Sequence, residues 1–235
     1  MNLKICGVIA VKSVQEVYCV IKTPYTRKCD LIELRLDYLE VLEQKELTKL
    51  LEELNIPTIL TLRSQQEGGE FMNSEEHRLE DLKKLLQLKP DYIDLEMHIE
   101  EEHLCSLMTC AKSKKVKTIL SSHYFENTPT TQDLTRRLEF GKEHEADVVK
   151  VIPFAKRIGD NDIVLALNKV GQNLGIDTVA FCMGSLGLPS RMLCVYWGAA
   201  FTYASLNEQN APGQLSAPVL GKFYELLQER CKTWK

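Results

Sequence analysis

The chain lacks any apolar run of the roughly 18 residues that a helix needs to cross a bilayer. Its first residues lead directly into an apolar stretch, without the long hydrophobic core or the small-residue cleavage site of a signal peptide. An excess of basic charge is also lacking, because 29 lysines and arginines stand against 33 acidic residues and give a net charge of −4. We therefore expect a soluble, cytoplasmic protein that binds neither nucleic acid nor a membrane.

Motifs that would hold a metal or a nucleotide are absent as well. The 8 cysteines are scattered, and none forms the C-x-x-C pair of zinc sites and redox motifs. There is no H-E-x-x-H motif and no Walker loop. His77, His98, His103 and His144 have no partner spacing that argues for a metal, and we expect no function for them. We therefore expect the cysteines to be reduced and buried, and we expect no metal or other cofactor.

What the chain does have is a repeated alternation of short apolar runs and amphipathic segments. We interpret the apolar runs as strands, namely Ile5–Val11, Leu31–Leu36, Thr58–Leu62, Tyr92–Leu95, Thr118–Ser121, Val148–Ile152, Thr178–Cys182 and, most weakly, Ala200–Tyr203. The amphipathic segments between them are typical of helices, for example Glu75–Leu88, Thr131–His144 and Asp162–Leu174. A last helix, Ala217–Cys231, follows the final strand.

Continuously apolar strands that are each followed by a helix indicate a parallel sheet covered on its outside. The number of such units fits an α/β protein with a closed (β/α)8 TIM barrel, and a doubly wound open sheet is the alternative. No linker rich in glycine, serine or proline divides the chain, so we expect a single domain over residues 1–235. In a barrel the active site lies where the strands end and the following loops begin.

Lys150 is the least expected charge, because it interrupts the apolar strand Val148–Ile152. A buried lysine is costly unless its charge is lost or matched. A desolvated lysine titrates low and becomes an amine nucleophile that forms a Schiff base with a ketone. His123 follows another apolar strand and is a candidate proton carrier beside such an imine. Both have structural alternatives, a lysine that reaches the sheet edge and a histidine with no chemical role.

Other charges gather at the ends of the predicted strands. Glu33, Arg35 and Asp37 alternate with leucines, and side chains two residues apart share a face, so all three are expected to point into a polar barrel mouth. An internal ion-pair network explains them equally well, and both interpretations are compatible. Asp94 and Glu96 close the fourth strand and have two interpretations, as part of the site or as a salt bridge to a neighbouring arginine, of which we favour the salt bridge.

Two glycine-containing loops follow strands. Arg63 ends the third strand and precedes Glu67, which opens a Glu-Gly-Gly-Glu turn typical either of a tightly turned active-site loop or of a surface turn. Arg191 ends the segment that starts at Met183 and opens a helix, where a guanidinium can clamp a carboxylate or phosphate. An ordinary helix start with an exposed arginine is the alternative.

Taken together, these residues resemble type I 3-dehydroquinate dehydratase, the Schiff-base enzyme of the shikimate pathway. Each motif alone is weak, but the set follows the order of the family and spans nearly the whole chain. The matching segments are Glu33–Asp37, Arg63 with Glu67–Gly69, Ser122–His123 with Thr128–Pro129, Lys150, Met183–Arg191 and Ala211–Gln214.

The resemblance implies that the substrate is 3-dehydroquinate, which loses water by syn elimination to give 3-dehydroshikimate without a metal or other cofactor. By this analogy Lys150 forms the imine, His123 transfers protons and Glu67 orients the histidine. The implied substrate-binding residues contact the ring hydroxyls (Glu33, Arg35 and Arg63), contact the carboxylate (Arg191), pack on the ring (Met183 and Tyr203) or belong to the loop that closes over the substrate (Asn210 and Gln214). The resemblance also suggests a homodimer.

Asn210 departs from the family, which usually has serine before Ala-Pro-Gly-Gln. Because asparagine is larger, we expect it to alter closure of the loop and substrate affinity more than the chemistry. Two rival functions fit the same fold: a class I aldolase, which would cleave a carbon–carbon bond, and a non-catalytic ligand-binding barrel. The presence of both Lys150 and His123 favours the dehydratase over a silent binder.

Overall fold

A computed structural model of the chain describes residues 3–207 and 211–233, so Asn210 lies outside the described residues. Its strands form one sheet in the order β7-β6-β5-β4-β3-β2-β1-β8, and every neighbouring pair is parallel. The strands are β1 Ile5–Ile9, β2 Leu31–Arg35, β3 Thr58–Thr61, β4 Tyr92–Glu96, β5 Lys117–Tyr124, β6 Val148–Pro153, β7 Asp177–Ala180 and β8 Thr202–Ser205.

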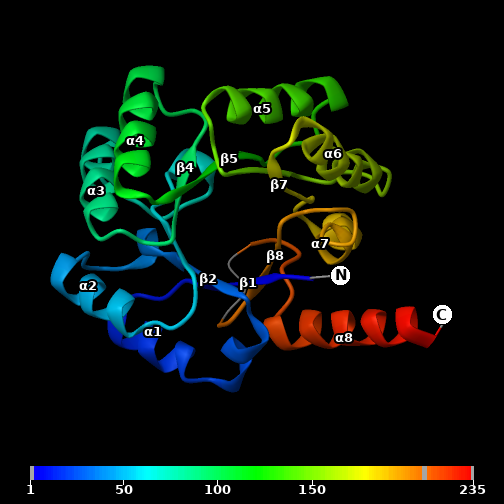
Figure 1. Ribbon diagram of the computed structural model, residues 1–235, viewed down its shortest axis with the longest axis horizontal. Coiled ribbons are helices and arrows are strands. Elements are labelled where there is room, and N and C mark those ends of the chain that lie inside the picture. The colour runs from blue at the N-terminus through cyan, green and yellow to red at the C-terminus, as the bar shows by residue number, and fades with distance from the viewer. Residues whose placement is uncertain (1–2, 208–210, 234–235) are drawn as a thin grey trace.

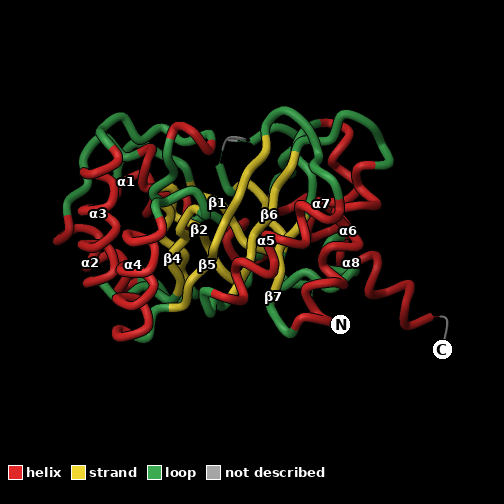
Figure 2. The backbone as a smooth tube through the Cα atoms, turned by 90° about the horizontal axis from the view of Figure 1, so that it is seen from above, coloured by secondary structure: helices red, strands yellow, loops and turns green. Residues whose placement is uncertain are grey.

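The sheet curls into a nearly closed barrel. β7 and β8 form no ladder, but the amide of Ala200, just before β8, donates to the carbonyl of Thr178 in β7 at 2.8 Å. Figure 2 shows the strands inside a surrounding shell of helices. The chain is thus a single (β/α)8 TIM barrel, which confirms the predicted fold class over the doubly wound sheet.

Helices alternate with the strands and cover the outside of the barrel (Figure 1). They are α1 Val14–Ile21, α2 Gln44–Glu53, α3 Glu75–Gln87, α4 Glu101–Lys114, α5 Thr131–Glu143, α6 Asp160–Leu174, α7 Leu188–Leu193 and α8 Ala217–Thr233. Short 3-10 turns lie at Pro24–Lys28, Leu36–Tyr38, Gln65–Glu67 and Ser185–Gly187. None of the described helices is long and apolar enough to cross a membrane.

Local sequence explains where several helices begin. Ser74 and Thr130 precede α3 and α5 in extended conformation, and their hydroxyls accept hydrogen bonds from the amides of His77 and Asp133. Such N-caps satisfy amides that have no partner inside the helix. Each helix then returns to the sheet and delivers the next strand to the barrel mouth.

Several predictions about local structure need correction. β1 ends at Ile9 rather than Val11, and β7 ends at Ala180 rather than Cys182. β5 continues to Tyr124 rather than ending at Ser121, and β8 begins at Thr202 rather than Ala200. Asp37 does not extend the face of Glu33 and Arg35, because β2 ends at Arg35 and Asp37 lies in a 3-10 turn. Its carboxylate accepts hydrogen bonds from the Arg35 side chain and from two loop amides, which stabilises that turn.

The cysteines are only partly as expected. Those in the described part of the chain are free, and Cys6, Cys182 and Cys194 are buried. Cys19 and Cys105, however, are exposed. Both lie on the solvent-facing side of outer helices. An apolar residue can occupy an exposed position, so the apolar character of the thiol does not require burial.

Close packing of α5 on the barrel depends on Gly141. A β-carbon at this position would lie 2.0 Å from the Val149 Cγ2 of β6. Valine is branched at its own β-carbon and has little freedom to move aside. The glycine therefore sets how near α5 approaches the strand that carries Lys150.

We expect Gly141→Ala to destabilise the protein by roughly 1–3 kcal/mol, because overpacking forces the helix away from the strand. Urea unfolding followed by circular dichroism measures the change. The matched control is Gly159→Ala, where nothing lies within 4 Å of the added carbon. Val149→Ala in the Gly141→Ala background should recover part of the loss, and an unchanged stability of Gly141→Ala would contradict this account.

Candidate active site

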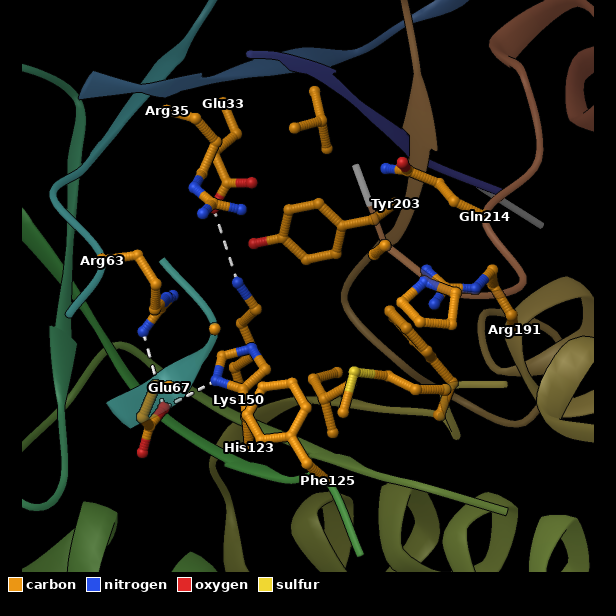
Figure 3. Close-up of a pocket in the computed structure, with 17 residues that line it drawn as sticks. Glu33, Arg35, Arg63, Glu67, His123, Phe125, Lys150, Arg191, Tyr203 and Gln214 are labelled. Carbon is orange, nitrogen blue, oxygen red and sulfur yellow. Dashed lines mark hydrogen bonds and ion pairs between the residues drawn. The ribbon is translucent and has the colours of Figure 1, made fainter. Parts of the chain in front are cut away.

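A cavity of about 150 Å³ lies at the mouth of the barrel, where the strands end. Figure 3 shows charged and aromatic side chains from both halves of the chain pointing into it. Its lining consists of Val8, Glu33, Arg35, Arg63, Glu67, Gly68, His123, Phe125, Lys150, Ile152, Phe181, Met183, Arg191, Tyr203, Ala211, Pro212 and Gln214. Every predicted site residue that the structure describes is among them.

Lys150 projects from the middle of β6 and is 6% exposed. Its Nζ lies 3.1 Å from an oxygen of Asp94 and 3.4 Å from an oxygen of Glu33. It also lies 4.4 Å from the centre of the Tyr203 ring. The charge of the buried lysine is therefore matched by two carboxylates and by an aromatic face.

Asp94 belongs to this site more directly than the sequence indicated. It pairs with Lys150, and its other oxygen lies 2.8 Å from Arg63 Nη2. Burial would raise the pKa of Asp94, but the charges of Arg63 and Lys150 outweigh burial and hold this pKa well below its usual range. Asp94 is thus an ionised group in contact with the proposed nucleophile.

His123 and Glu67 are joined by a short hydrogen bond in the cavity. His123 Nδ1 lies 2.6 Å from Glu67 Oε2. Because an ionised carboxylate can only accept, Nδ1 carries the hydrogen, and Nε2 keeps its lone pair. Burial and the charge of Arg63 lower the pKa of His123 to about 4, although Glu67 opposes them. The ring is therefore neutral near neutral pH and is able to accept a proton.

Glu67 is ionised for a related reason. Burial would raise its pKa, but hydrogen bonds from His123 and His98 and the charge of Arg63 lower it to about 2. The carboxylate thus remains an acceptor throughout the pH range in which His123 is neutral, and it fixes the orientation of that ring.

His98 contacts Glu67, which the sequence did not reveal. Its Nδ1 lies 3.4 Å from the second oxygen of Glu67, and its Nε2 lies 3.6 Å from Glu96. The hydrogen bond to Glu67 raises the pKa of His98 above its ordinary value. The two groups lie 31 positions apart, so only the folded barrel brings them together. The expectation that His98 has no function stays a prediction.

Arg63 connects the charged groups. It is 3% exposed, and its Nη1 donates to Ser121 Oγ at 2.7 Å and pairs with Glu96 at 3.1 Å. Glu96 pairs in turn with Arg78 at 2.9 Å. These contacts confirm that Asp94 and Glu96 form salt bridges to a neighbouring arginine. Both terminal nitrogens of Arg63 contact protein groups, and its contact with substrate hydroxyls stays a prediction.

Arg191 faces the cavity from α7, on the opposite side from Glu67 (Figure 3). It is 3% exposed, its guanidinium lies 4.3 Å from the centre of the Phe181 ring, and no carboxylate in residues 3–207 and 211–233 forms an ion pair with it. Burial lowers the pKa of Arg191 to about 10, so the group stays charged at neutral pH. A buried cation of this kind favours an anionic group of a ligand.

The remaining predicted residues complete the wall. Arg35 faces the cavity but makes a bidentate pair with Asp37 at 2.7 and 2.9 Å. Met183, Tyr203 and Gln214 are buried there, and no partner of the Tyr203 hydroxyl is found among the described residues. Their individual substrate contacts stay predictions.

Phe125 is a lining residue that the sequence analysis missed. It is 44% exposed at the rim of the cavity. Gly68 has a φ of 76° beneath it, and a β-carbon there would lie 2.6 Å from the Phe125 ring. The glycine pair was a visible signal for a close approach, but the sequence did not show which side chain approaches.

Comparison with known proteins gives one family. Residues 5–231 match the model of type I 3-dehydroquinase. The chain is 36% identical to a 3-dehydroquinate dehydratase of Thermococcus onnurineus over 95% of its length and 98% of the relative's. It is 37% identical to the Thermococcus gammatolerans enzyme of the same name, over 96% of its length and 100% of the relative's.

Solved structures agree. A crystal structure of the type I 3-dehydroquinate dehydratase of Clostridium difficile with covalently modified comenic acid has a TM-score of 0.88 and 28% identity, and covers 97% of this chain and 93% of that one. The 3-dehydroquinate dehydratase of Enterococcus faecalis has a TM-score of 0.82 and 26% identity, with 96% and 94% coverage. The family match spans nearly the whole chain, and the solved relatives share its fold. The chain belongs to the type I 3-dehydroquinase family.

Proposed function

We propose that this enzyme, a hydro-lyase by family, dehydrates 3-dehydroquinate to 3-dehydroshikimate through an imine on Lys150. One observation carries the proposal. Lys150 and His123 lie on the neighbouring strands β6 and β5 and line one cavity, with Arg191 facing them. An amine, a proton carrier and a buried cation are the groups that imine-based elimination on a keto acid requires.

The amine acts first. Lys150 loses a proton, for which Glu33 is the carboxylate acceptor within reach, while ionised Asp94 stays paired with Arg63. The nitrogen adds to the ketone carbon, and loss of water gives the imine. The protonated imine withdraws electrons from the neighbouring carbon, so its C–H bond becomes acidic. The nitrogen is the electron sink, and no metal is needed for this step.

His123 then transfers the proton. Its Nε2 removes the acidic hydrogen, and the C–H electron pair moves toward the nitrogen to form an enamine. When that pair returns to form the carbon–carbon double bond, the adjacent C–O bond breaks, and His123 gives its proton to the departing hydroxyl. One residue serves both steps, which fits a syn elimination. Hydrolysis of the imine releases the product and regenerates Lys150.

The surrounding groups position the substrate. Arg191 suits the carboxylate, since it is a buried guanidinium at the far wall. Tyr203 lies beside Lys150, where its ring would pack against the substrate ring and its hydroxyl would bind a substrate oxygen. The Gln214 loop is proposed to close over the cavity, which would keep bulk water from the imine.

A homodimer and a cytoplasmic location in the shikimate pathway are further parts of this proposal. They are supported by the family membership and not by contacts in the structure. A class I aldolase and a silent binding barrel have no specific observation in their favour, because Glu67 and His123 are arranged as an oriented proton carrier.

The direct test is the ultraviolet absorbance of the conjugated enone product after mixing with 3-dehydroquinate. Wild type should give the signal and Lys150→Ala should not. Lys156→Ala removes an exposed lysine instead and, as the control, should also give the signal. His123→Ala should lower kcat by about 10²–10⁴-fold, the usual loss for a general acid–base residue. Near-normal turnover of His123→Ala, or absence of the enone with folded wild type, would refute the proposal.

Arg191→Gln should raise KM for 3-dehydroquinate by about 10- to 100-fold, because it removes a charged hydrogen-bonding partner of the carboxylate. Arg136→Gln is the control, since Arg136 is an exposed arginine on α5. Steady-state kinetics of both variants separates KM from kcat. An unchanged KM for Arg191→Gln would move the carboxylate site elsewhere in the cavity.

His98→Leu should raise the pKa of Glu67 from its value of about 2, because the hydrogen bond from His98 favours the ionised carboxylate. The carboxylate resonance of Glu67 in an NMR titration measures this pKa. The acid limb of kcat/KM should stay where it is, since it is set by His123, whose pKa of about 4 is the higher of the two. His103→Leu, at an exposed histidine of α4, should leave the pKa of Glu67 unchanged. An equal pKa of Glu67 in wild type and His98→Leu would leave His98 without an effect on Glu67.

A further inference from the structure

A second group of reactive side chains lies far from the cavity, on the outside of the barrel. A groove of about 1040 Å³ runs between α4 and α5, and it shares no lining residue with the catalytic cavity. Glu101 and Cys105 lie on α4, and His144 follows α5. Their ligand atoms all lie within 4.8 Å of one another.

The spacing of these residues suits a metal ion. Glu101 and Cys105 are four positions apart on one helix and share a face. The Glu101 Oε1 lies 2.9 Å from His144 Nε2 and 3.9 Å from Cys105 Sγ. Ligand atoms of a tetrahedral zinc ion are roughly 3.3–3.7 Å apart, given zinc bonds of about 2.0–2.3 Å. The separations of 2.9 and 3.9 Å bracket that range, and all three ligand atoms lie within 4.8 Å of one another.

The ring of His144 is already oriented for ligation. Its Nδ1 lies 2.9 Å from the carbonyl oxygen of Phe140, which can only accept, so Nδ1 carries a hydrogen. The Phe140 ring holds the imidazole in place, with ring centres 4.1 Å apart. Metal-bound histidines commonly donate their other ring N–H to a backbone carbonyl in this way.

The short contact between Nε2 and Glu101 brings two possible ligand atoms together. A neutral ring with its hydrogen on Nδ1 offers a lone pair at Nε2, and a carboxylate oxygen also offers only lone pairs. Two acceptors 2.9 Å apart need either a proton or a metal ion between them. The proton gives an ordinary salt bridge, and the exposed thiol of Cys105 adds a third ligand that a salt bridge does not use.

We propose that Glu101, Cys105 and His144 bind one Zn²⁺ ion, with water in the fourth position. A thiolate with an imidazole favours zinc over magnesium or calcium, which prefer oxygen ligands. The structure explains why no sequence motif predicted this site: two ligands come from α4, and the third lies 39 to 43 positions later, at the end of the next helix.

The site has a structural consequence. In Figure 1, α4 lies beside α3 and α5 beside α6, and these are the helix pairs that pack together. A zinc ion would join the two pairs across the groove that separates them. Only the surface pair Lys112–Glu145 otherwise spans this groove as an ion pair in the described part of the chain. Zinc should therefore raise the thermal stability of the barrel wall without entering the chemistry.

The test is a titration of reduced, chelator-treated protein with Co²⁺ as spectroscopic probe, and with Zn²⁺ in calorimetry. Wild type should bind one ion and show the near-ultraviolet charge-transfer band of a cobalt–thiolate bond. Cys105→Ala should lose this band and bind zinc at least about 10-fold more weakly. Cys110→Ala, another cysteine of α4 outside the group, should behave as wild type.

Glu101→Gln serves as a second variant that keeps the thiol and the fold. It should retain the cobalt–thiolate band and weaken zinc binding. Protons compete for His144 and Cys105, so affinity should rise with pH. Binding that is equal in wild type, Cys105→Ala and Glu101→Gln, or no binding at one equivalent, would overturn the proposal. Dehydratase activity is expected to persist without zinc, so failure here and failure of the proposed function are separate outcomes.

Discussion

The burial of Lys150 inside the barrel is the constraint on which the rest of the site depends. An ammonium in a strand with no exposed residue is tolerated only if its charge is matched. Asp94 from β4 and Glu33 from β2 supply that match at 3.1 and 3.4 Å. The lysine is therefore held in the centre of the cavity by groups from strands on one side of the barrel, and its other side remains open to a substrate.

The same network sets the state of His123. Arg63 forms ion pairs with Asp94, Glu96 and Glu67, and its positive charge compensates part of the negative charge of these carboxylates. Its positive charge, together with burial, keeps His123 neutral, while Glu67 fixes which ring nitrogen carries the hydrogen. A neutral base beside a buried amine is the combination that imine chemistry needs, and it results from the arrangement of charges rather than from any one residue.

The sequence predicted the barrel well because buried parallel strands give continuous apolar runs, and charges that interrupt or end them stand out. Lys150 and Glu33 were visible for this reason, and Arg191 because it lies in a glycine-containing loop that opens a helix. The partnership of Asp94 with Lys150 and of His98 with Glu67 was not, because neither has a local signature. Phe125 and the zinc ligands likewise depend on the approach of segments that are distant along the chain. The strand with the weakest apolar pattern, β8, lies two positions later than predicted, and β5 extends three positions further because Ser122 and His123 give no apolar signal.

The central claim is that Lys150 carries the substrate covalently. The most direct measurement is reduction with borohydride in the presence of 3-dehydroquinate, followed by peptide mass spectrometry. The account predicts one adduct of the mass of the reduced imine on the peptide that contains Lys150, retained in His123→Ala and absent from Lys150→Ala. An adduct on another lysine, or one that persists in Lys150→Ala, would contradict it.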